Sequence, residues 1–493
     1  MNRKMYTYLL GVVLKVEALF MIPSAFISLF YHEQQSFFAF FVTILLALAI
    51  AIPLTRHEPT NKLIYMKEGL CIAALAWILI SLVGAVPFVL SNAIPSYLDS
   101  LFETVSGFTT TGASILNDVE SLPRGMLFWR SFTHWIGGMG VLVFLLAVVP
   151  FSGGSMLHIM RAESPGPSTN KFVPKVKQTA KILYGIYIIL TVAEVILLLL
   201  GGMPLLDSLI NSFGTAGTGG FAMKNQSIAA YHNAYFEYVI GIFMILFGIN
   251  FNIYFLLLTK KFKESFHNEE IKVYLSVIGA AVLLITLNIY RTNYQTISEA
   301  FRNAFFQVSS IITTTGFATA NYDKWPQFSR VILLSLMFCG ACAGSTGGGM
   351  KVSRLIIAFK TAKRELKRML HPKVVDSVRM DGKAIDNETI SLVNVYIILY
   401  IAILALSVLL ISLEGFNFDT TFSSVVACIN NIGPGLGIVG PIGNYSGFSP
   451  LGKIVLILDM LIGRLEIFPI LTLVSLVARK RVHNRTVGPS FYE

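Results

Sequence analysis

Charged residues are scarce in this sequence. Of its 493 residues, 13% are Asp, Glu, Lys or Arg, whereas 54% are hydrophobic, and the mean hydropathy is +0.68. A soluble protein of this size carries about a quarter of its residues as charged side chains. The composition therefore excludes a chain of ordinary water-soluble domains.

Cysteine and histidine are also few, with four and eight residues. Cys339 and Cys342 have the C-x-x-C spacing of redox proteins, but they lie in an apolar stretch without a surrounding βαβ pattern. His134 and His158 have no metal-ligand spacing with other His or Cys residues, and the apolar stretches contain no Ser–His grouping or paired Asp. We therefore do not expect an enzyme.

Long hydrophobic runs, by contrast, recur throughout the chain. Runs of about 20 residues can cross a bilayer core of about 30 Å as helices. Transmembrane β-strands would be shorter and would alternate in polarity. The first run, 6–31, is too long for a signal-peptide core and lacks a small-residue cleavage site. The sequence thus predicts an all-α polytopic membrane protein, with ten spans by our count.

The net charge is +11, and the location of the basic residues indicates what this charge is for. Most of the 38 Lys and Arg residues gather at 3–4, 56–67, 161–181, 260–272, 351–383 and 479–485. These clusters alternate with hairpins, so they fall on one face, which the positive-inside rule makes cytoplasmic. We therefore expect a protein in a lipid bilayer with both termini in the cytoplasm, and no nucleic-acid partner.

Four short stretches are each followed by a turn rich in Thr, Gly or Asn. The stretches cover 97–108, 204–214, 296–311 and 418–429, and the turns read TTTG (109–112), AGTGG (216–220), TTTG (313–316) and NNIG (430–433). The final glycines are 108, 96 and 117 residues apart. Each stretch is too short to span a bilayer. The pattern predicts one unit, made of helix, short helix, turn and helix, used four times.

This repetition divides the chain into five parts. Residues 1–60 would form two extra N-terminal transmembrane helices, near 6–31 and 36–55. The repeats would cover 61–155, 156–262, 263–385 and 386–493, the third with an intramembrane gating loop. Their outer helices are expected near 66–91 and 126–150, 180–201 and 234–259, 272–290 and 327–360, and 389–412 and 450–478.

The four turns have the chemistry of a cation filter. Irregular backbone at membrane depth must be buried in protein or line water, and four loops around a pore satisfy both conditions. Glycine adopts positive φ without strain, so carbonyl groups can face one axis and replace a hydration shell. The C-terminal end of each short helix would favour a cation, and oxygen ligands without carboxylates suit a monovalent ion better than Ca²⁺ or Mg²⁺. The predicted filter residues are Thr110, Thr111, Gly112, Thr218, Gly219, Gly220, Thr314, Thr315, Gly316, Asn431, Ile432 and Gly433. The alternative is that Gly and Thr only allow close helix packing, but four similar spacings favour the filter.

Two features are candidates for a gate. The expected span 327–360 is interrupted by Gly344, Ser345, Thr346, Gly347, Gly348 and Gly349, and each glycine costs roughly 1 kcal/mol in a helix. Arg464 lies near the middle of the expected last span, where an arginine is costly. We expect Arg464 to contact the glycine loop and to oppose cation passage. The alternatives are an ordinary kink, and a pairing of Arg464 with Glu466 or Asp459 for folding alone.

Several motifs resemble those of the Trk/Ktr/HKT superfamily of potassium transporters. The resemblance covers nearly the whole chain, and the two extra N-terminal helices make it most similar to the TrkH branch. The motifs are FETVSGFTTTG (102–112), WIGGMG (135–140), GACAGSTGGGMK (340–351) and NNIGPGLG (430–437).

The resemblance implies a pseudo-fourfold pore in each subunit and a homodimer. It also implies K⁺ uptake through a bacterial inner membrane, K⁺ bound at the filter carbonyls, and gating by a TrkA-like cytoplasmic subunit that binds NAD or ATP. Gly435 to Gly440 spells G-x-G-x-x-G, but no strand precedes it, so we expect no nucleotide site in this chain. The second turn departs from the Thr-rich form, which leaves permeation of Rb⁺ or Na⁺ open. The rival function is a carrier that couples K⁺ to H⁺ or Na⁺.

Overall fold

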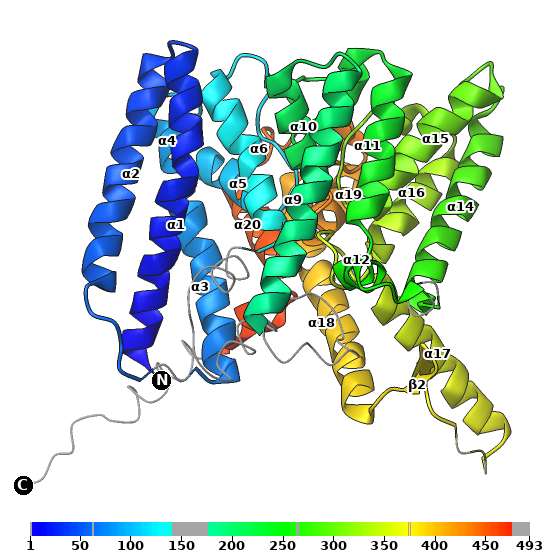
Figure 1. Cartoon of the computed structure of the whole chain (residues 1–493). Coiled ribbons are helices and arrows are strands. Elements are labelled where there is room, and N and C mark those ends of the chain that lie inside the picture. Colours follow the sequence, from blue (N-terminus) through cyan, green and yellow to red (C-terminus); the bar gives the residue numbers. More distant parts are fainter. Residues whose placement is uncertain are drawn as a thin grey trace, which may run out of the picture.

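Helices make up nearly all the regular structure of the protein (Figure 1). The computed structural model describes residues 2–61, 64–140, 176–262, 265, 267–372, 374 and 376–475. Two helices come first, α1 (Arg3–Phe30) and α2 (Gln34–Thr55), and they pack along each other at one side of the molecule. The Glu33 carboxylate between them accepts hydrogen bonds from the backbone N–H groups of Arg124 (2.6 Å) and Gly125 (3.0 Å). This contact fixes the N-terminal pair to the first repeat.

The first helix and the short helix of each repeat form where the sequence predicts them. The first helices are α3 (Met66–Gly84, followed by α4, Val86–Leu90), α9 (Val176–Leu200), α14 (Glu269–Ile289) and α18 (Asn387–Ile411). The short pore helices are α5 (Tyr97–Phe108), α10 (Leu205–Ala216), α15 (Ile297–Ile312) and α19 (Phe418–Ile429). Each pore helix has one acidic residue in its first turn: Asp99, Asp207, Glu299 and Asp419. A carboxylate there stabilises the positive end of the helix dipole.

The second helix of each repeat differs from the prediction. Continuous spans over 234–259, 327–360 and 450–478 are wrong, because each is broken. The observed elements are α6 (Arg124–Gly138), α11 (Ala234–Phe247) with α12 (Phe251–Leu258), α16 (Gln327–Cys339) with α17 (Val352–Leu370), and α20 (Pro450–Arg464). The part of the expected span 126–150 that follows residue 140 lies outside the described residues.

The breaks have local causes. The α11–α12 pair is bent by 88°, and Asn250 caps the start of α12 by accepting from the Asn252 N–H. Gly340 ends α16 at a φ of 67°, and Glu466 and Ile467 follow α20 at φ values of 58° and 68°. As a result, six described helices are long and apolar enough to cross a membrane, or seven if the bent pair counts as one span. The prediction of ten treated the broken helices as complete.

The repeats close into a ring. The second helix of each repeat packs against the pore helix of the next one: α6 against α10, α11 against α15, α16 against α19, and α20 against α5. The fourth contact returns to the first repeat. The fold is therefore a pseudo-fourfold arrangement of four helix–pore-loop–helix repeats, with two additional N-terminal helices.

The polar face of the molecule carries α17 and the start of α1 (Figure 1). We call it the basic face, because α17 contributes many of the basic residues between 351 and 383. A small antiparallel hairpin of β1 (Arg379–Met380) and β2 (Lys383–Ala384) connects α17 to α18. The predicted basic clusters at 161–181, in part, and at 479–485 lie outside the described residues.

Candidate functional site

The four predicted filter turns share one backbone conformation. When the second turn is counted from Gly217, so that each turn has four residues, the second residue of every turn has a positive φ value, and so does its final glycine. The second residues are Thr110 (55°), Thr218 (54°), Thr314 (61°) and Asn431 (55°), and the glycines are Gly112 (78°), Gly220 (78°), Gly316 (82°) and Gly433 (91°). Between them, the N–H groups of Thr111, Gly219, Thr315 and Ile432 each donate to the carbonyl group five residues earlier, at 2.8–2.9 Å. Three different sequences, of which TTTG occurs twice, thus build the same turn after a pore helix.

The final glycines bring the turns together. A Cβ atom on Gly112 would lie 2.0 Å from the Gly219 carbonyl oxygen, in the next repeat. The same close approach joins Gly220 to Thr315 O (2.1 Å), Gly316 to Ile432 O (2.0 Å) and Gly433 to Thr111 O (2.7 Å). The contacts run from repeat one to two, three, four and back to one. The turns therefore surround a common axis, and a side chain at any of these glycines would collide with a neighbouring backbone.

Side chains hold the turns in different ways. In repeats one and three, the hydroxyl groups of Thr109 and Thr111, and of Thr313 and Thr315, are hydrogen bonded at 2.8 Å. In repeat four, the Asn431 amide donates to the Thr111 hydroxyl and to the Met460 carbonyl group, both at 2.9 Å. The backbone is common to all four turns, whereas its side-chain support is not.

A cavity of about 160 Å³ lies beside the final glycines of the turns. Its lining includes Gly112, Gly220, Gly316 and Gly433, one from each repeat. Arg130 and Lys224 also line it. The cavity is therefore bordered by all four turns.

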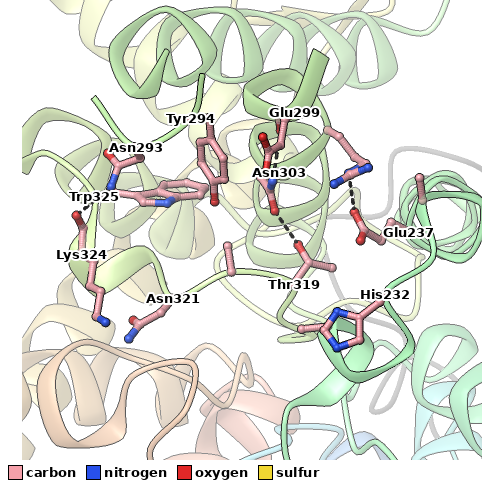
Figure 2. Close-up of a pocket in the computed structure, with 14 residues that line it drawn as sticks. His232, Glu237, Asn293, Tyr294, Glu299, Asn303, Thr319, Asn321, Lys324 and Trp325 are labelled. Atoms are coloured by element: carbon pink, nitrogen blue, oxygen red, sulfur yellow. Dashed lines mark hydrogen bonds and ion pairs between the residues drawn. The ribbon is translucent and has the colours of Figure 1, made fainter. Parts of the chain in front are cut away.

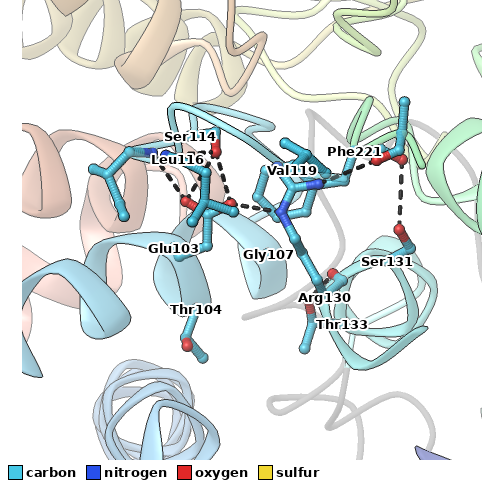
Figure 3. Close-up of polar contacts among 12 residues, drawn as sticks. Glu103, Thr104, Gly107, Ser114, Leu116, Val119, Arg130, Ser131, Thr133 and Phe221 are labelled. Carbon is cyan, nitrogen blue, oxygen red and sulfur yellow. Dashed lines mark hydrogen bonds and ion pairs between the residues drawn. The ribbon is translucent and has the colours of Figure 1, made fainter. Parts of the chain in front are cut away.

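A buried ion pair lies at the edge of this cavity (Figure 3). Arg130 donates to Glu103 at 2.6 Å, and both side chains are almost fully buried. Glu103 also accepts from the Ser114 hydroxyl (2.9 Å) and the Ile115 N–H (3.0 Å), just after the first turn. The Arg130 guanidinium stacks on the Phe221 ring of repeat two, 3.5 Å from its centroid. The sequence analysis missed this pair, although a Glu and an Arg within two apolar segments were the available signal.

The glycine-rich segment 344–349 lies directly against two of the turns. The Gly348 N–H donates to the Thr314 hydroxyl at 2.6 Å. A Cβ atom on Gly347 would lie 3.0 Å from Thr313 O, and one on Gly348 would lie 2.5 Å from Asn430 O. Because Thr313 and Asn430 are the first residues of the third and fourth turns, the segment crosses below them.

Both ends of this segment are anchored. The Glu270 carboxylate, at the start of α14, accepts from the Ala343 N–H (2.7 Å) and the Ser353 N–H (3.1 Å). The break between α11 and α12 holds it as well, since Cys342 N donates to Gly248 O and Phe251 N donates to Gly344 O, both at 3.0 Å. We call residues 340–351 the crossing loop. It is an ordered loop with defined contacts.

Arg464 joins this loop to the first repeat. Its guanidinium donates to the carbonyl groups of Thr346 (2.8 Å), Gly137 (2.5 Å) and Gly138 (2.8 Å). The expected contact with the glycine segment is therefore present. The expected location within a continuous span is wrong, because Arg464 is the last residue of α20. Of the alternative partners, Glu466 forms an ion pair with Arg354, and Asp459 accepts from the Ser407 hydroxyl.

Other charged groups around the loop were not predicted. Lys351 was counted among the cytoplasmic charges, but it is only 2% exposed and its ammonium group donates to Gly347 O. Arg354 is also buried, against Glu466 and the Tyr396 ring. Sequence patterns could not separate these two residues from the exposed basic residues that follow them on α17.

A larger pocket, of about 460 Å³, lies away from the filter turns (Figure 2). It is lined by residues of repeats two and three, and it contains the ion pair between Glu237 and Arg302 (3.0 Å). None of the four final glycines lines it. The larger pocket is therefore not the place where the four turns converge.

Four pore helices whose turns meet around one axis define a membrane protein of the pore-loop class. The chain belongs to the TrkH family of cation transport proteins, whose sequence profile matches residues 32–482. It is 37% identical to the Trk system potassium uptake protein TrkH of Salmonella typhimurium over 96% of this chain and 98% of that protein. It is 32% identical to TrkG of Escherichia coli, with the same coverage. The crystal structure of the potassium transporter TrkH from Vibrio parahaemolyticus superimposes with a TM-score of 0.87, at 31% identity, over 96% of this chain and 98% of that one.

Proposed function

We propose that this protein takes up K⁺ through a pore whose filter consists of the four turns. The closed ring of glycine–carbonyl contacts carries this proposal, because it gathers the peptide oxygens of all four repeats around one axis. Carbonyl oxygens in such a ring can replace the hydration shell of K⁺. The relatives support the choice of ion, since they are named as potassium uptake proteins.

The proposed K⁺ ligands are the backbone carbonyl groups of the turns. They belong to Thr110, Thr111 and Gly112, Thr218, Gly219 and Gly220, Thr314, Thr315 and Gly316, and Asn431, Ile432 and Gly433. The turns follow the C-terminal ends of the pore helices, whose negative partial charge favours a cation. The filter needs no carboxylate ligand, which suits a monovalent ion.

The crossing loop and Arg464 form the proposed gate. The loop lies below the third and fourth turns, and Arg464 ties it to Gly137 and Gly138 of repeat one. A partly buried guanidinium at this position opposes a cation by like-charge repulsion. Opening would move the loop and release Arg464 from Thr346. Gly344, Ser345, Thr346, Gly347, Gly348 and Gly349 supply the flexible part of the loop.

We further propose that the subunit forms a homodimer in a bacterial inner membrane, with both termini in the cytoplasm. The basic face would then be cytoplasmic, in accordance with the positive-inside rule. A TrkA-like subunit that binds NAD or ATP would act on the gate from this face. We assign the N-terminal helices and the four repeats to five parts of the chain, with boundaries after residues 60, 155, 262 and 385.

The rival function is a carrier that couples K⁺ to H⁺ or Na⁺. Many carriers consist of inverted repeats that rock around a central site. The four repeats here follow one another in a single ring with the same internal order, so they do not form inverted halves. An imposed pH or Na⁺ gradient that drives saturable K⁺ accumulation would favour the carrier.

The direct test is radiolabelled Rb⁺ uptake into liposomes that contain the purified chain. We expect Gly316→Ser to abolish uptake, because its Cβ atom would lie 2.0 Å from Ile432 O. Gly202→Ser is the matched control, since Gly202 also has a positive φ (89°) but no atom within 4 Å of the added Cβ. Uptake that survives Gly316→Ser would contradict the proposed filter.

A further inference from the structure

The second filter turn lacks the hydroxyl–hydroxyl bond that braces the first and third turns. Its threonine, Thr218, donates to the adjacent Gly217 carbonyl group instead, at 2.6 Å. In repeats one and three, the first and third residues of the turn are threonines whose hydroxyl groups bond each other at 2.8 Å. The equivalent residues in repeat two are Gly217 and Gly219, which have no side chains to make such a bond. The second turn nevertheless has the same backbone conformation as the others.

The imidazole ring of His134 occupies the space that a side chain on Gly219 would need. A Cβ atom on Gly219 would lie 2.3 Å from His134 Nδ1, 2.4 Å from Cγ and 2.6 Å from Cε1. The main chain of His134 borders Gly217 as well, with its carbonyl oxygen 2.2 Å from the position of a Cβ there. On its other side, the ring packs against Phe221, with 4.2 Å between the ring centroids. His134 thus lies directly behind the second turn, and it is fully buried.

His134 is also hydrogen bonded to the end of the first pore helix, just before the first turn. Its Nδ1 atom lies 2.8 Å from the Gly107 carbonyl oxygen. A carbonyl oxygen only accepts, so Nδ1 carries the proton and donates it. The same oxygen accepts from the N–H of Thr110, the second residue of the first turn, at 3.1 Å. One side chain therefore joins two adjacent repeats, through a hydrogen bond to the end of the first pore helix and through packing against the second filter turn.

We propose that His134 is the positioning residue for the second filter turn, in which its ring replaces the missing threonine brace and thereby supports ion selectivity. This inference rests on the proposed function of the turns as a K⁺ filter. It also explains the departure of repeat two from the Thr-rich form: Gly219 leaves room for the ring. The sequence alone did not point to this role, because His134 has no metal-ligand spacing with other His or Cys residues.

The test measures the K⁺/Na⁺ permeability ratio of purified protein in planar bilayers under bi-ionic conditions. We expect His134→Ala to lower this ratio about tenfold, the factor that corresponds to the loss of roughly one hydrogen bond. We expect His134→Asn to retain more of the ratio, because its amide can donate to Gly107 O from nearly the same position as Nδ1. His134→Leu keeps the volume without the donor and should fall between Ala and Asn. Thermal unfolding in detergent shows whether each variant is folded.

A compensating pair distinguishes positioning from a general effect on folding. Gly219→Ala alone should abolish conduction, since its methyl group would collide with the imidazole ring. In the His134→Ala background the three clashing ring atoms are gone, so the double variant should conduct again. Gly219 does not have a positive φ, and the three atoms nearest to an added Cβ all belong to the His134 ring, so this ring is the main steric obstacle to an alanine there.

The outcomes are separable. A wild-type protein that passes no K⁺, or does not prefer it to Na⁺, would overturn the proposed filter and this inference with it. A selective wild type with an equally selective His134→Ala variant would overturn the inference alone. So would a double variant that is as inactive as Gly219→Ala. Lower selectivity with recovery in the double variant would support His134 as the positioning residue.

Discussion

The filter turns and the crossing loop beneath them are built on opposite plans. The turns come from all four repeats, share one set of backbone angles and contact each other in a closed ring. The crossing loop comes from the third repeat alone, and charged side chains surround it, including Lys351, Arg464 and Glu270. The first region repeats one conformation, whereas the second breaks the repetition.

The difference matches two physical demands. An ion that loses its water needs oxygen atoms on all sides, which four equivalent turns provide. A gate needs one element with two alternative positions, and a single loop can move without disturbing the other three repeats. Glycines serve both regions differently: in the turns they permit close contact between backbones, and in the loop they reduce the cost of leaving the helix.

The largest effect should come from breaking the support of the filter. Glu103→Ala would leave Arg130 buried without its partner, a change that typically costs about 3–5 kcal/mol of stability. The measurement is thermal or denaturant unfolding of the purified protein in detergent. Glu120→Ala is the control, because Glu120 also forms an ion pair, with Lys224, but this pair is exposed, and such pairs contribute at most about 1 kcal/mol. Equal losses in both variants would show that burial of the first pair is irrelevant.

The next effect should come from the gate. We expect Arg464→Ala to raise Rb⁺ flux about tenfold, because lowering a barrier by about 1.4 kcal/mol has this result. Deletion of Gly347–Gly349 should also raise flux, since it removes the part of the loop that lies below the third and fourth turns. Arg330→Ala, which breaks an ion pair with Asp419 near the surface, is the control and should leave flux unchanged. If neither gate variant changes conductance, the crossing loop is not a gate.

A smaller effect should come from the anchor of the loop. Glu270→Gln replaces the carboxylate that accepts from the Ala343 and Ser353 N–H groups with a neutral amide, which keeps one carbonyl oxygen. Hydrogen bonds to charged groups are about twice as strong as neutral ones, so the ends of the loop should be held less firmly. We expect Rb⁺ flux to rise by about two- to fivefold, which is less than for Arg464→Ala. The neighbouring Glu269→Gln, whose partner Lys360 is on α17, serves as the control. A larger rise from the control would place the constraint outside the loop.

The smallest effect concerns the basic face and is a pH dependence. Asp386 caps α18, and the hydrogen bonds from the Thr389 hydroxyl and N–H lower the pKa of its carboxyl group below the ordinary value of 3.8. A lowered pKa means that this stabilisation is complete above the ordinary value and is lost as the pH falls through the folded-state value. We expect the unfolding temperatures of wild type and Asp386→Asn to run parallel from pH 7 to about pH 4 and to converge or cross only below it. Asn caps as well as Asp but does not titrate. A difference that changes near neutral pH would contradict this assignment.

The sequence predicted the elements that have their own local signals. The pore helices were correct within a few residues because they have capping residues such as Ser96, Thr296 and Asn417 and end in Thr-, Gly- or Asn-rich turns. The broken second helices were missed because hydropathy continues across the breaks. Asn250 and Glu466 lie in largely apolar runs. Asn250 caps α12 through the nearby Asn252 N–H, whereas Glu466 pairs with Arg354, which is distant in sequence.

The site was predictable in the same uneven way. The contact of Arg464 with the glycine segment could be expected, because a charge and an interrupted helix at membrane depth each need a partner. The burial of Lys351 could not be expected, because in the sequence it directly precedes the many lysines and arginines of α17. The role of His134 depends on the absence of side chains at Gly217 and Gly219, which gains meaning only when the turns are superimposed on one another.

All four corners of the filter ring are encoded in one polypeptide, and this has an evolutionary consequence. In a homotetrameric channel a single codon change alters every corner at once, whereas here it alters only one. Each turn could therefore acquire its own supporting side chains. The Thr pairs of turns one and three, His134 behind turn two and Asn431 in turn four are examples. The contacts between the backbones of neighbouring turns restrict such substitutions to residues behind the ring. They therefore conserve the conformation of the backbone whose carbonyl oxygens line it.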